Sequence, residues 1–222
     1  MTEGIEPVEP VDPERPGFGR RQFLLGGVGI AGAVAVLAAC GGDDDSSSGG
    51  LSSGDGSPTE GTDGDLTVAT AAAGLEVLAV GTYQAALDAA TGGKLGAVPP
   101  AVAQFVTTAL GHHKEHLAAW NKVLADGGEP AVTMPNAALK PTVDAGLAKV
   151  TDAAGAAELA LQLETIAAQT YLKAIPTLSS SAAVRLAGSI QVVDQQHQAI
   201  LLYALGRYPV PDVFQKTDMA AI

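Results

Sequence analysis

The sequence predicts an all-α fold, a four-helix bundle in which a long crossover joins the second helix to the third. Alanine is abundant and only 4% of the residues are aromatic, which suits closely packed helices better than strands. Apolar residues recur at helical spacing over four long segments, and glycines or prolines separate these segments. In addition, a Glu followed seven residues later by a Tyr occurs in both the first and the third segment.

The first two helices form the first predicted hairpin. One helix is expected over residues 65–90, with Asp65 as its N-cap and the glycine pair at 92–93 as its end. The second helix begins at the proline pair 99–100, because Pro suits a first helical turn, and ends before the glycine pair 127–128. The connection is short, so the two helices should pack antiparallel.

A long connection and a second hairpin follow. The connection covers residues 126–151, contains three prolines and is expected to form one short helix over 143–150. The third helix is expected over 153–175 and the fourth over 182–205. Two hairpins joined by one long crossover form a bundle that differs from a simple up-down bundle.

The predicted domain covers residues 65–215 and is followed by a short tail, 216–222. Apolar residues make up 47% of the chain, which is ample for one core of roughly 150 residues. Prolines extend the segment after the fourth helix, and its two aromatic residues, Tyr208 and Phe214, are expected to dock on the bundle.

Charge and motifs exclude several functions. Asp and Glu outnumber Lys and Arg by 24 to 12, so we predict no nucleic-acid partner, because such binding needs clustered basic residues. The sequence also has no P-loop, no dinucleotide-binding glycine motif after a strand and no zinc-type cysteine pair.

Residues 1–39 are typical of a signal peptide. Arg20 and Arg21 precede an uncharged run rich in Gly and Ala, and this pair followed by Gln-Phe-Leu resembles a twin-arginine signal. Leu-Ala-Ala before Cys40 resembles a bacterial lipobox, whose Cys is lipidated and becomes the mature N-terminus. With a single Cys no intramolecular disulfide can form. An uncleaved membrane anchor is the alternative interpretation.

Residues 40–64 are mainly Gly, Ser, Asp and Thr and are expected to form a flexible tether. The predicted location is therefore outside the cytoplasm, with the protein held on the cell membrane by lipidated Cys40 after export. A homodimer is one possible assembly, and the sequence does not identify a protein partner.

Six ionisable residues on the apolar faces of the four helices predict a metal site inside the bundle. They are Glu76, His113, His116, Glu164, Asp194 and His197. In carboxylate di-metal bundles, two helices each supply a Glu and the other two each supply a Glu-x-x-His pair. The i, i+3 spacing places both members of a pair on one helix face, and this mixture of ligands suits Fe or Mn.

The pattern resembles the ferritin-like superfamily, and in particular exported actinobacterial ferritin-like domain proteins. The resemblance covers about residues 65–215 and includes the segments 111–121 and 206–214. It implies that Tyr83 hydrogen-bonds Glu164 across the bundle and that Tyr171 hydrogen-bonds Glu76. Such bonds to a ligand orient it toward the metal.

Two residues depart from the di-iron pattern. Asp194 is one methylene shorter than Glu, and His113 stands where the second helix would offer a Glu. Three carboxylates then face two ions, so a single metal, or Zn or Cu in place of Fe or Mn, is an alternative. His112 could serve as a substitute ligand, whereas Glu115 is expected to lie in solvent.

The sequence thus predicts an exported, lipid-anchored protein that binds metal in its bundle. A redox-active metal would permit oxidase- or peroxidase-like chemistry. The alternative is a cell-envelope module that keeps the fold, binds no metal and uses the buried polar residues as a structural network. Iron storage is disfavoured, since a lipidated tether on every chain fits poorly with a closed shell.

Overall fold

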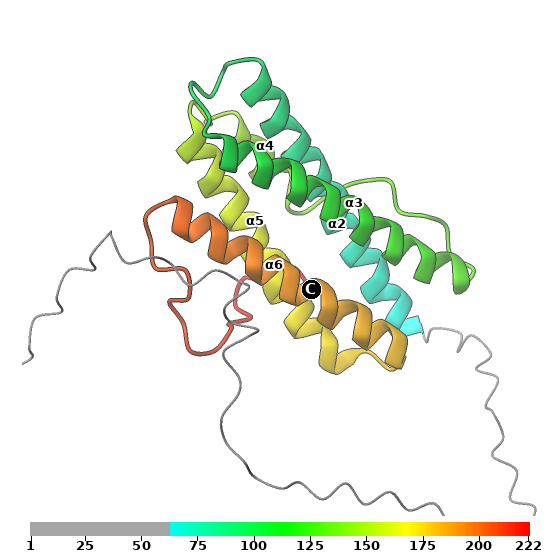
Figure 1. The fold of residues 1–222 in the computed structure, drawn as a ribbon. Coiled ribbons are helices and arrows are strands. Elements are labelled where there is room, and N and C mark those ends of the chain that lie inside the picture. Colours follow the sequence, from blue (N-terminus) through cyan, green and yellow to red (C-terminus); the bar gives the residue numbers. More distant parts are fainter. Residues whose placement is uncertain (1–62) are drawn as a thin grey trace, which may run out of the picture. The chain divides into compact units, whose positions relative to one another are not determined.

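The computed structural model describes residues 63–222, and every regular element in this range is helical (Figure 1). The elements are α2 (Asp63–Thr91), α3 (Pro100–Asp126), α4 (Lys140–Leu147), α5 (Ala153–Ala174), the 3-10 turn η1 (Ile175–Thr177) and α6 (Ser181–Ala204). The predicted all-α bundle is confirmed. The predicted signal peptide, and the tether apart from Asp63 and Gly64, lie outside the described residues.

The bundle consists of two helical hairpins. Helix α2 packs along α3, and α5 packs along α6, while the crossover that carries α4 links the hairpins (Figure 1). Asn121 fixes the crossover to α3, because its amide donates to the carbonyl of Val132 at 3.2 Å and accepts from the Val132 N–H at 2.8 Å. The short helix of the crossover begins at Lys140, three residues earlier than predicted.

Small residues let the four helices approach closely, and larger ones fill the space between them. One apolar cluster combines buried alanines of α2 and α6 with Trp120 and Leu124. A second cluster surrounds Tyr83, Ala109 and Leu110. Along α2 and α3, the predicted polar residues fall between these two clusters, so the sequence places charges at a level that apolar layers enclose.

Helix α2 is long and apolar enough to cross a membrane, judged by length and composition alone. In the bundle, however, 56% of its most apolar window is buried, and the helix places Glu76 in the interior. These features describe the core helix of a bundle.

The N-terminal boundary of α2 corrects the prediction for Asp65. The helix begins at Asp63, so Asp65 is not the N-cap but lies within the first turn. Its carboxylate is buried and accepts the backbone N–H groups of Ser179 at 2.8 Å and Ser180 at 2.7 Å. Asp65 therefore ties the first helix to the turn that precedes α6.

The tail also differs from its prediction. Tyr208 and Phe214 are 74% and 84% exposed, so the expectation that they dock on the bundle is wrong. The chain instead attaches further on, where the Met219 N–H donates to Gln169 at 2.7 Å and the Ala221 N–H donates to Thr170 at 2.9 Å. Backbone hydrogen bonds to buried polar groups of α5, and not aromatic packing, hold the end of the chain.

Candidate metal centre

The structure brings all six predicted residues together, with each of the four long helices contributing. Glu76 comes from α2, Glu164 from α5, the pair His113 and His116 from α3, and the pair Asp194 and His197 from α6. Five of the six are at most 3% exposed, and the side chain of His116 is 11% exposed. The i, i+3 spacing within each pair therefore directs both side chains inward, as the sequence indicated.

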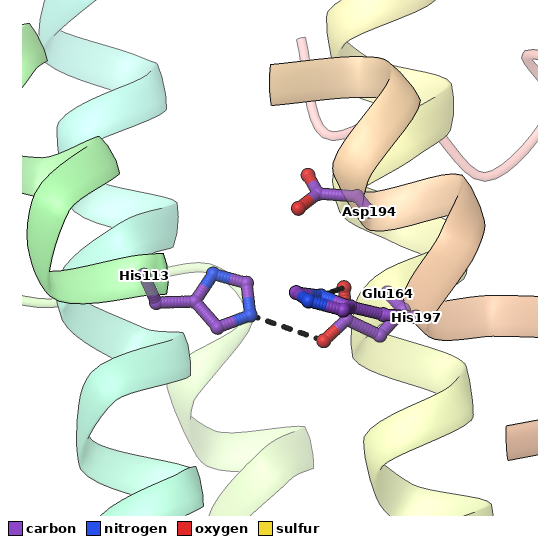
Figure 2. A group of neighbouring side chains, drawn as sticks. All are labelled: His113, Glu164, Asp194 and His197. Atoms are coloured by element: carbon purple, nitrogen blue, oxygen red, sulfur yellow. Dashed lines mark hydrogen bonds and ion pairs between the residues drawn. The ribbon is translucent and has the colours of Figure 1, made fainter. Parts of the chain in front are cut away.

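His113 lies between the two glutamates and contacts both. Its Nδ1 is 2.8 Å from Glu76 Oε2. Its Nε2 is 3.0 Å from Glu164 Oε1 (Figure 2). A ring that donates from both nitrogens is a protonated imidazolium. The other oxygen of Glu164 is 3.2 Å from His197 Nδ1. Each glutamate thus has a partner for both of its oxygens once the tyrosines are included.

Both crossed hydrogen bonds expected from the resemblance are present. Tyr171 donates its hydroxyl to Glu76 Oε1 at 2.5 Å, and Tyr83 donates to Glu164 Oε1. The indole of Trp120 extends the first of these chains, since its N–H donates to the Tyr171 hydroxyl at 2.9 Å. Each glutamate is therefore fixed from the opposite hairpin, which limits its movement.

Asp194 and His116 stand apart from this network. Within residues 63–222, neither carboxylate oxygen of Asp194 has a hydrogen-bond partner, and neither does Nδ1 of His116. Figure 2 shows the Asp194 carboxylate projecting from α6 with no interaction drawn to its neighbours. Buried polar groups are almost always hydrogen-bonded, so three open atoms at one level need an explanation.

The three carboxylates of the cluster differ in the direction of their pKa shifts. Burial raises the pKa of Asp194 well above its usual value, and the charges of Glu164 and Glu76 raise it further. Burial also acts on Glu164, but His113 and His197 outweigh it and lower the pKa of Glu164 to about 2. Burial would likewise raise the pKa of Glu76, but the hydrogen bond from His113 and the nearby imidazole of His116, 3.7 Å away, lower it.

The same interactions act on the partners of the glutamates. Burial alone would lower the pKa of His113, yet Glu164 and Glu76 raise it well above its usual value. Burial and the charge of Glu164 raise the pKa of Tyr83, and burial with Glu76 does the same for Tyr171. Both tyrosines therefore remain neutral donors near neutral pH.

His112 and Glu115, the remaining polar candidates of α3, are both exposed, and Glu115 lies in solvent as expected. His112 nevertheless touches the cluster, because its Nδ1 is 3.0 Å from Nε2 of His197. Partial burial, then the charges of His197 and His116, lower the pKa of His112. A chain of contacts thus runs from solvent through His112 and His197 to Glu164.

Sequence reasoning missed three supporting residues. Trp120 lies one turn after His116 on the same helix, and its indole reaches the Tyr171 hydroxyl. Gln198 donates its amide to the backbone carbonyl of Glu164 at 3.0 Å. Phe105 packs edge-on against His197, with ring centres 5.7 Å apart. Trp120 and Phe105 share the helical spacing of His113 and His116, which is a signal in the sequence, whereas Gln198 gave none.

These residues fit a metal ion. Two overlapping groups have ligand atoms within 4.8 Å of one another: His113, Glu164, Asp194 and His197 in one, and Glu76, His113 and His116 in the other. Two ligands of one ion lie at most about 4 Å apart when each bond is about 2 Å. The open Nδ1 of His116 is 3.7 Å from Glu76 Oε2 and 3.9 Å from Asp194 Oδ1. A cation among them would satisfy the atoms that the protein leaves without partners.

Fold and site together define a helical-bundle protein with a buried carboxylate–histidine cluster at its centre. A family model described as a ferritin-like domain matches residues 64–207, and the chain belongs to this family. No curated protein and no solved structure matches the chain. The family assignment confirms the predicted superfamily and leaves the function to be argued from the site.

Proposed function

We propose that this ferritin-like bundle binds a divalent transition-metal ion at its central cluster. The observation that carries the proposal is the buried Asp194 carboxylate, which has no hydrogen-bond partner among the described residues, beside the equally open Nδ1 of His116. A carboxylate that is isolated in this way costs free energy unless a cation or a proton compensates it. The ligands would be Glu76, His113, His116, Glu164, Asp194 and His197.

The pairing within the cluster bears on how many ions bind. His113 already uses both ring nitrogens on Glu76 and Glu164, so it must give up one of these contacts before it can bind a metal. Asp194 and His116 need no such rearrangement. We therefore expect one ion to bind more firmly than a second. Iron or manganese fits the oxygen ligands, zinc or copper fits the imidazoles, and a redox-active metal would supply electron transfer.

The test is metal content, measured by inductively coupled plasma mass spectrometry on protein exported by its native host. The double variant His116→Ala/His197→Ala removes two ligands, and Glu115→Gln, one residue from His116 but exposed, is the matched control. We expect metal in the wild type and in Glu115→Gln, and its loss in the double variant. Near two Fe or Mn per chain indicates a di-metal site, and one Zn or Cu indicates a single site. Metal-free wild-type protein would overturn the proposal.

The second candidate function is a metal-free structural or binding module. It is favoured by His113, whose imidazolium places a positive charge between two carboxylates where a metal would otherwise supply it. In that case nitrogen NMR would show both ring nitrogens of His113 protonated near neutral pH, and adding Zn²⁺ or Mn²⁺ would leave the spectrum unchanged. A shift of the His113 signals on adding either ion would exclude this alternative.

The proposal includes export and lipid anchoring, which rest on the motifs at Arg20, Arg21 and Cys40. Replacing both arginines by Lys should retain the protein in the cytoplasm. Cys40→Ser should release the exported protein from the membrane fraction. A mature N-terminus at a residue other than Cys40, or membrane retention of the Cys40→Ser protein, would contradict the lipid anchor.

A further inference from the structure

A cavity of about 350 Å³ is lined by residues of α2, α3 and α5 near the α2–α3 turn. Figure 1 shows this turn at one end of the bundle. Nine of the 22 residues that line the cavity are alanine, contributed by α2, α3 and α5. Alanine pairs on facing helices leave space that larger side chains would fill. Small-molecule sites are apolar hollows of about 300–1,000 Å³, so this space is a candidate binding site.

The walls of the cavity are apolar. Most other lining residues are Leu, Val or Phe, and the two hydroxyl-bearing side chains are already engaged. Thr82 donates to the carbonyl of Leu78 at 2.9 Å, and Tyr83 donates to Glu164. A stable water needs two to four polar partners, and the hydroxyl-bearing side chains of these walls are already bonded elsewhere. An apolar ligand fits this space better than solvent.

Lys94 supplies the one charge among the lining residues. It lies in the turn after α2, is exposed, and makes no ion pair within residues 63–222. No acidic residue lines the cavity. An apolar chamber with a single free ammonium at its exposed edge suits a molecule with an apolar body and an anionic end.

The volume limits the size of the ligand. One water takes about 30 Å³ of liquid, so the cavity corresponds to about a dozen heavy atoms. Decanoate, a ten-carbon chain with one carboxylate, has this size. We infer that the cavity binds a medium-length, single-chain anionic amphiphile, with its chain among the alanines and its head group at Lys94.

The inner wall places such a ligand beside the central cluster. The Tyr83 ring lines the cavity on one side and stacks on His113 on the other, with ring centres 5.2 Å apart. Phe105 likewise separates the cavity from His197. One layer of aromatic rings therefore lies between the ligand and the polar cluster. The inference does not rest on metal binding, because none of the cavity's contacts involves a metal.

The test is isothermal titration calorimetry of the full chain with decanoate, in the presence of a chelator. Each methylene removed should weaken binding about fourfold, so octanoate should bind more weakly than decanoate by roughly 15-fold. Lys94→Gln should weaken decanoate binding about two- to fivefold, as expected for an exposed ion pair, and leave decanol binding unchanged. Because a chelator is present, a failure here is distinct from a failure to bind metal.

Variants that fill the cavity locate the ligand. Ala157→Phe should abolish binding, and Ala90→Leu, which adds less volume, should weaken it. Ala118→Phe on the exposed face of α3 is the control and should bind as the wild type does. Circular dichroism verifies that each variant folds. Absence of decanoate binding by the wild type, or undiminished binding by folded Ala157→Phe and Ala90→Leu, would overturn the inference. Equal effects of Lys94→Gln on decanoate and decanol would overturn the role of Lys94.

Discussion

Two aspartates of this protein are about equally buried, but they differ in their hydrogen bonding. Asp65 near the start of α2 is 1% exposed and Asp194 in α6 is 0% exposed. Both oxygens of Asp65 accept backbone N–H groups, at 2.8 and 2.7 Å. Neither oxygen of Asp194 accepts a hydrogen bond from any residue in the range 63–222.

The two carboxylates therefore differ in what they can do: Asp65 holds elements of the fold together, whereas Asp194 remains open to a ligand. Hydrogen bonds to a charged group contribute about 1.5–3 kcal/mol each, so Asp65 stabilises the contact between the two hairpins. Asp194 instead sits beside two other carboxylates, and burial with their charges raises its pKa well above the usual value. A buried carboxylate without a hydrogen-bond partner among the described residues is free to accept a cation, as proposed above. The two glutamates lie beside Asp194 in the cluster, but their oxygens have tyrosine and histidine partners, as those of Asp65 have backbone partners.

The largest effect should come from removing the open carboxylate. Asp194→Asn keeps the shape of the side chain but loses its charge, and we expect metal affinity to fall about 1,000-fold, beyond the 10–100-fold typical of outer partners. Calorimetric titration with Zn²⁺ and Mn²⁺ measures this change. Asp88→Asn, an exposed substitution on α2, should leave affinity unchanged. If the Asp194→Asn protein binds metal as the wild type does, Asp194 is not a metal ligand.

Acid should destabilise the metal-free protein because it protonates Glu164. The folded pKa of Glu164, about 2, lies below its ordinary value of 4.5. The stability that the ionised group contributes is therefore fully present above pH 4.5 and is lost as the pH falls toward 2. The shift corresponds to about 3 kcal/mol. Urea unfolding from pH 6 to 2.5 should show this loss, and Glu164→Gln should flatten the curve. An equally steep curve for the variant would contradict the assignment.

Conservative substitution of the two aspartates tests the comparison in one experiment. Asp65→Asn loses the charge and leaves one N–H group poorly paired, so we expect the free energy of unfolding to fall by about 2 kcal/mol. Asp194→Asn in metal-free protein should change it by less than about 1 kcal/mol, because no hydrogen bond is lost. Urea denaturation at pH 7 with a chelator measures both. A larger loss of unfolding free energy for Asp194→Asn than for Asp65→Asn would contradict both assignments.

The tyrosines should have a smaller effect on the metal. Tyr171→Phe removes the hydrogen bond to Glu76 and leaves the Trp120 N–H without its acceptor. Loss of an orienting partner typically costs 10–100-fold in metal affinity, and we expect about tenfold here because His113 still contacts Glu76. Tyr203→Phe is the control, since Tyr203 is 76% exposed. An unchanged affinity for Tyr171→Phe would make that tyrosine a packing residue only.

The smallest effect should come from a carboxylate at the surface. Asp126 pairs with Lys122 at 2.7 Å, but the two side chains are 53% and 73% exposed. Exposed pairs one helical turn apart contribute about 0.3–0.5 kcal/mol, so Asp126→Asn should lower the free energy of unfolding by no more than this. Urea denaturation at low and high salt checks it, because salt should remove the difference. A larger loss would show that burial is a poor guide to the importance of a carboxylate in this protein.

The helical spacing of apolar and polar residues predicted both the bundle and the cluster. Glu76 and Glu164 recur with a Tyr seven residues later, and each His pair keeps helical spacing, so the sequence alone placed these side chains on inward faces. Helical spacing is a local property, fixed by the geometry of 3.6 residues per turn. This is why the six site residues could be named before any contact was known.

Contacts between elements could not be predicted in the same way. Asp65 reads locally as a helix cap, and only the position of the turn before α6 makes it a link between hairpins. The prolines of the tail predicted an extended chain, yet Phe214 lies in solvent because the attachment occurs later, at Met219.

The sequence by itself determined the four helices, the family and the identity of the inward-facing polar residues, because each follows from local spacing and residue chemistry. Tertiary structure alone decided which of these residues have partners. His113 became the bridge between the glutamates, Asp194 was left without a hydrogen bond, and facing alanines left a cavity beside Tyr83. Each outcome depends on distances across the bundle, which the packing of whole helices sets.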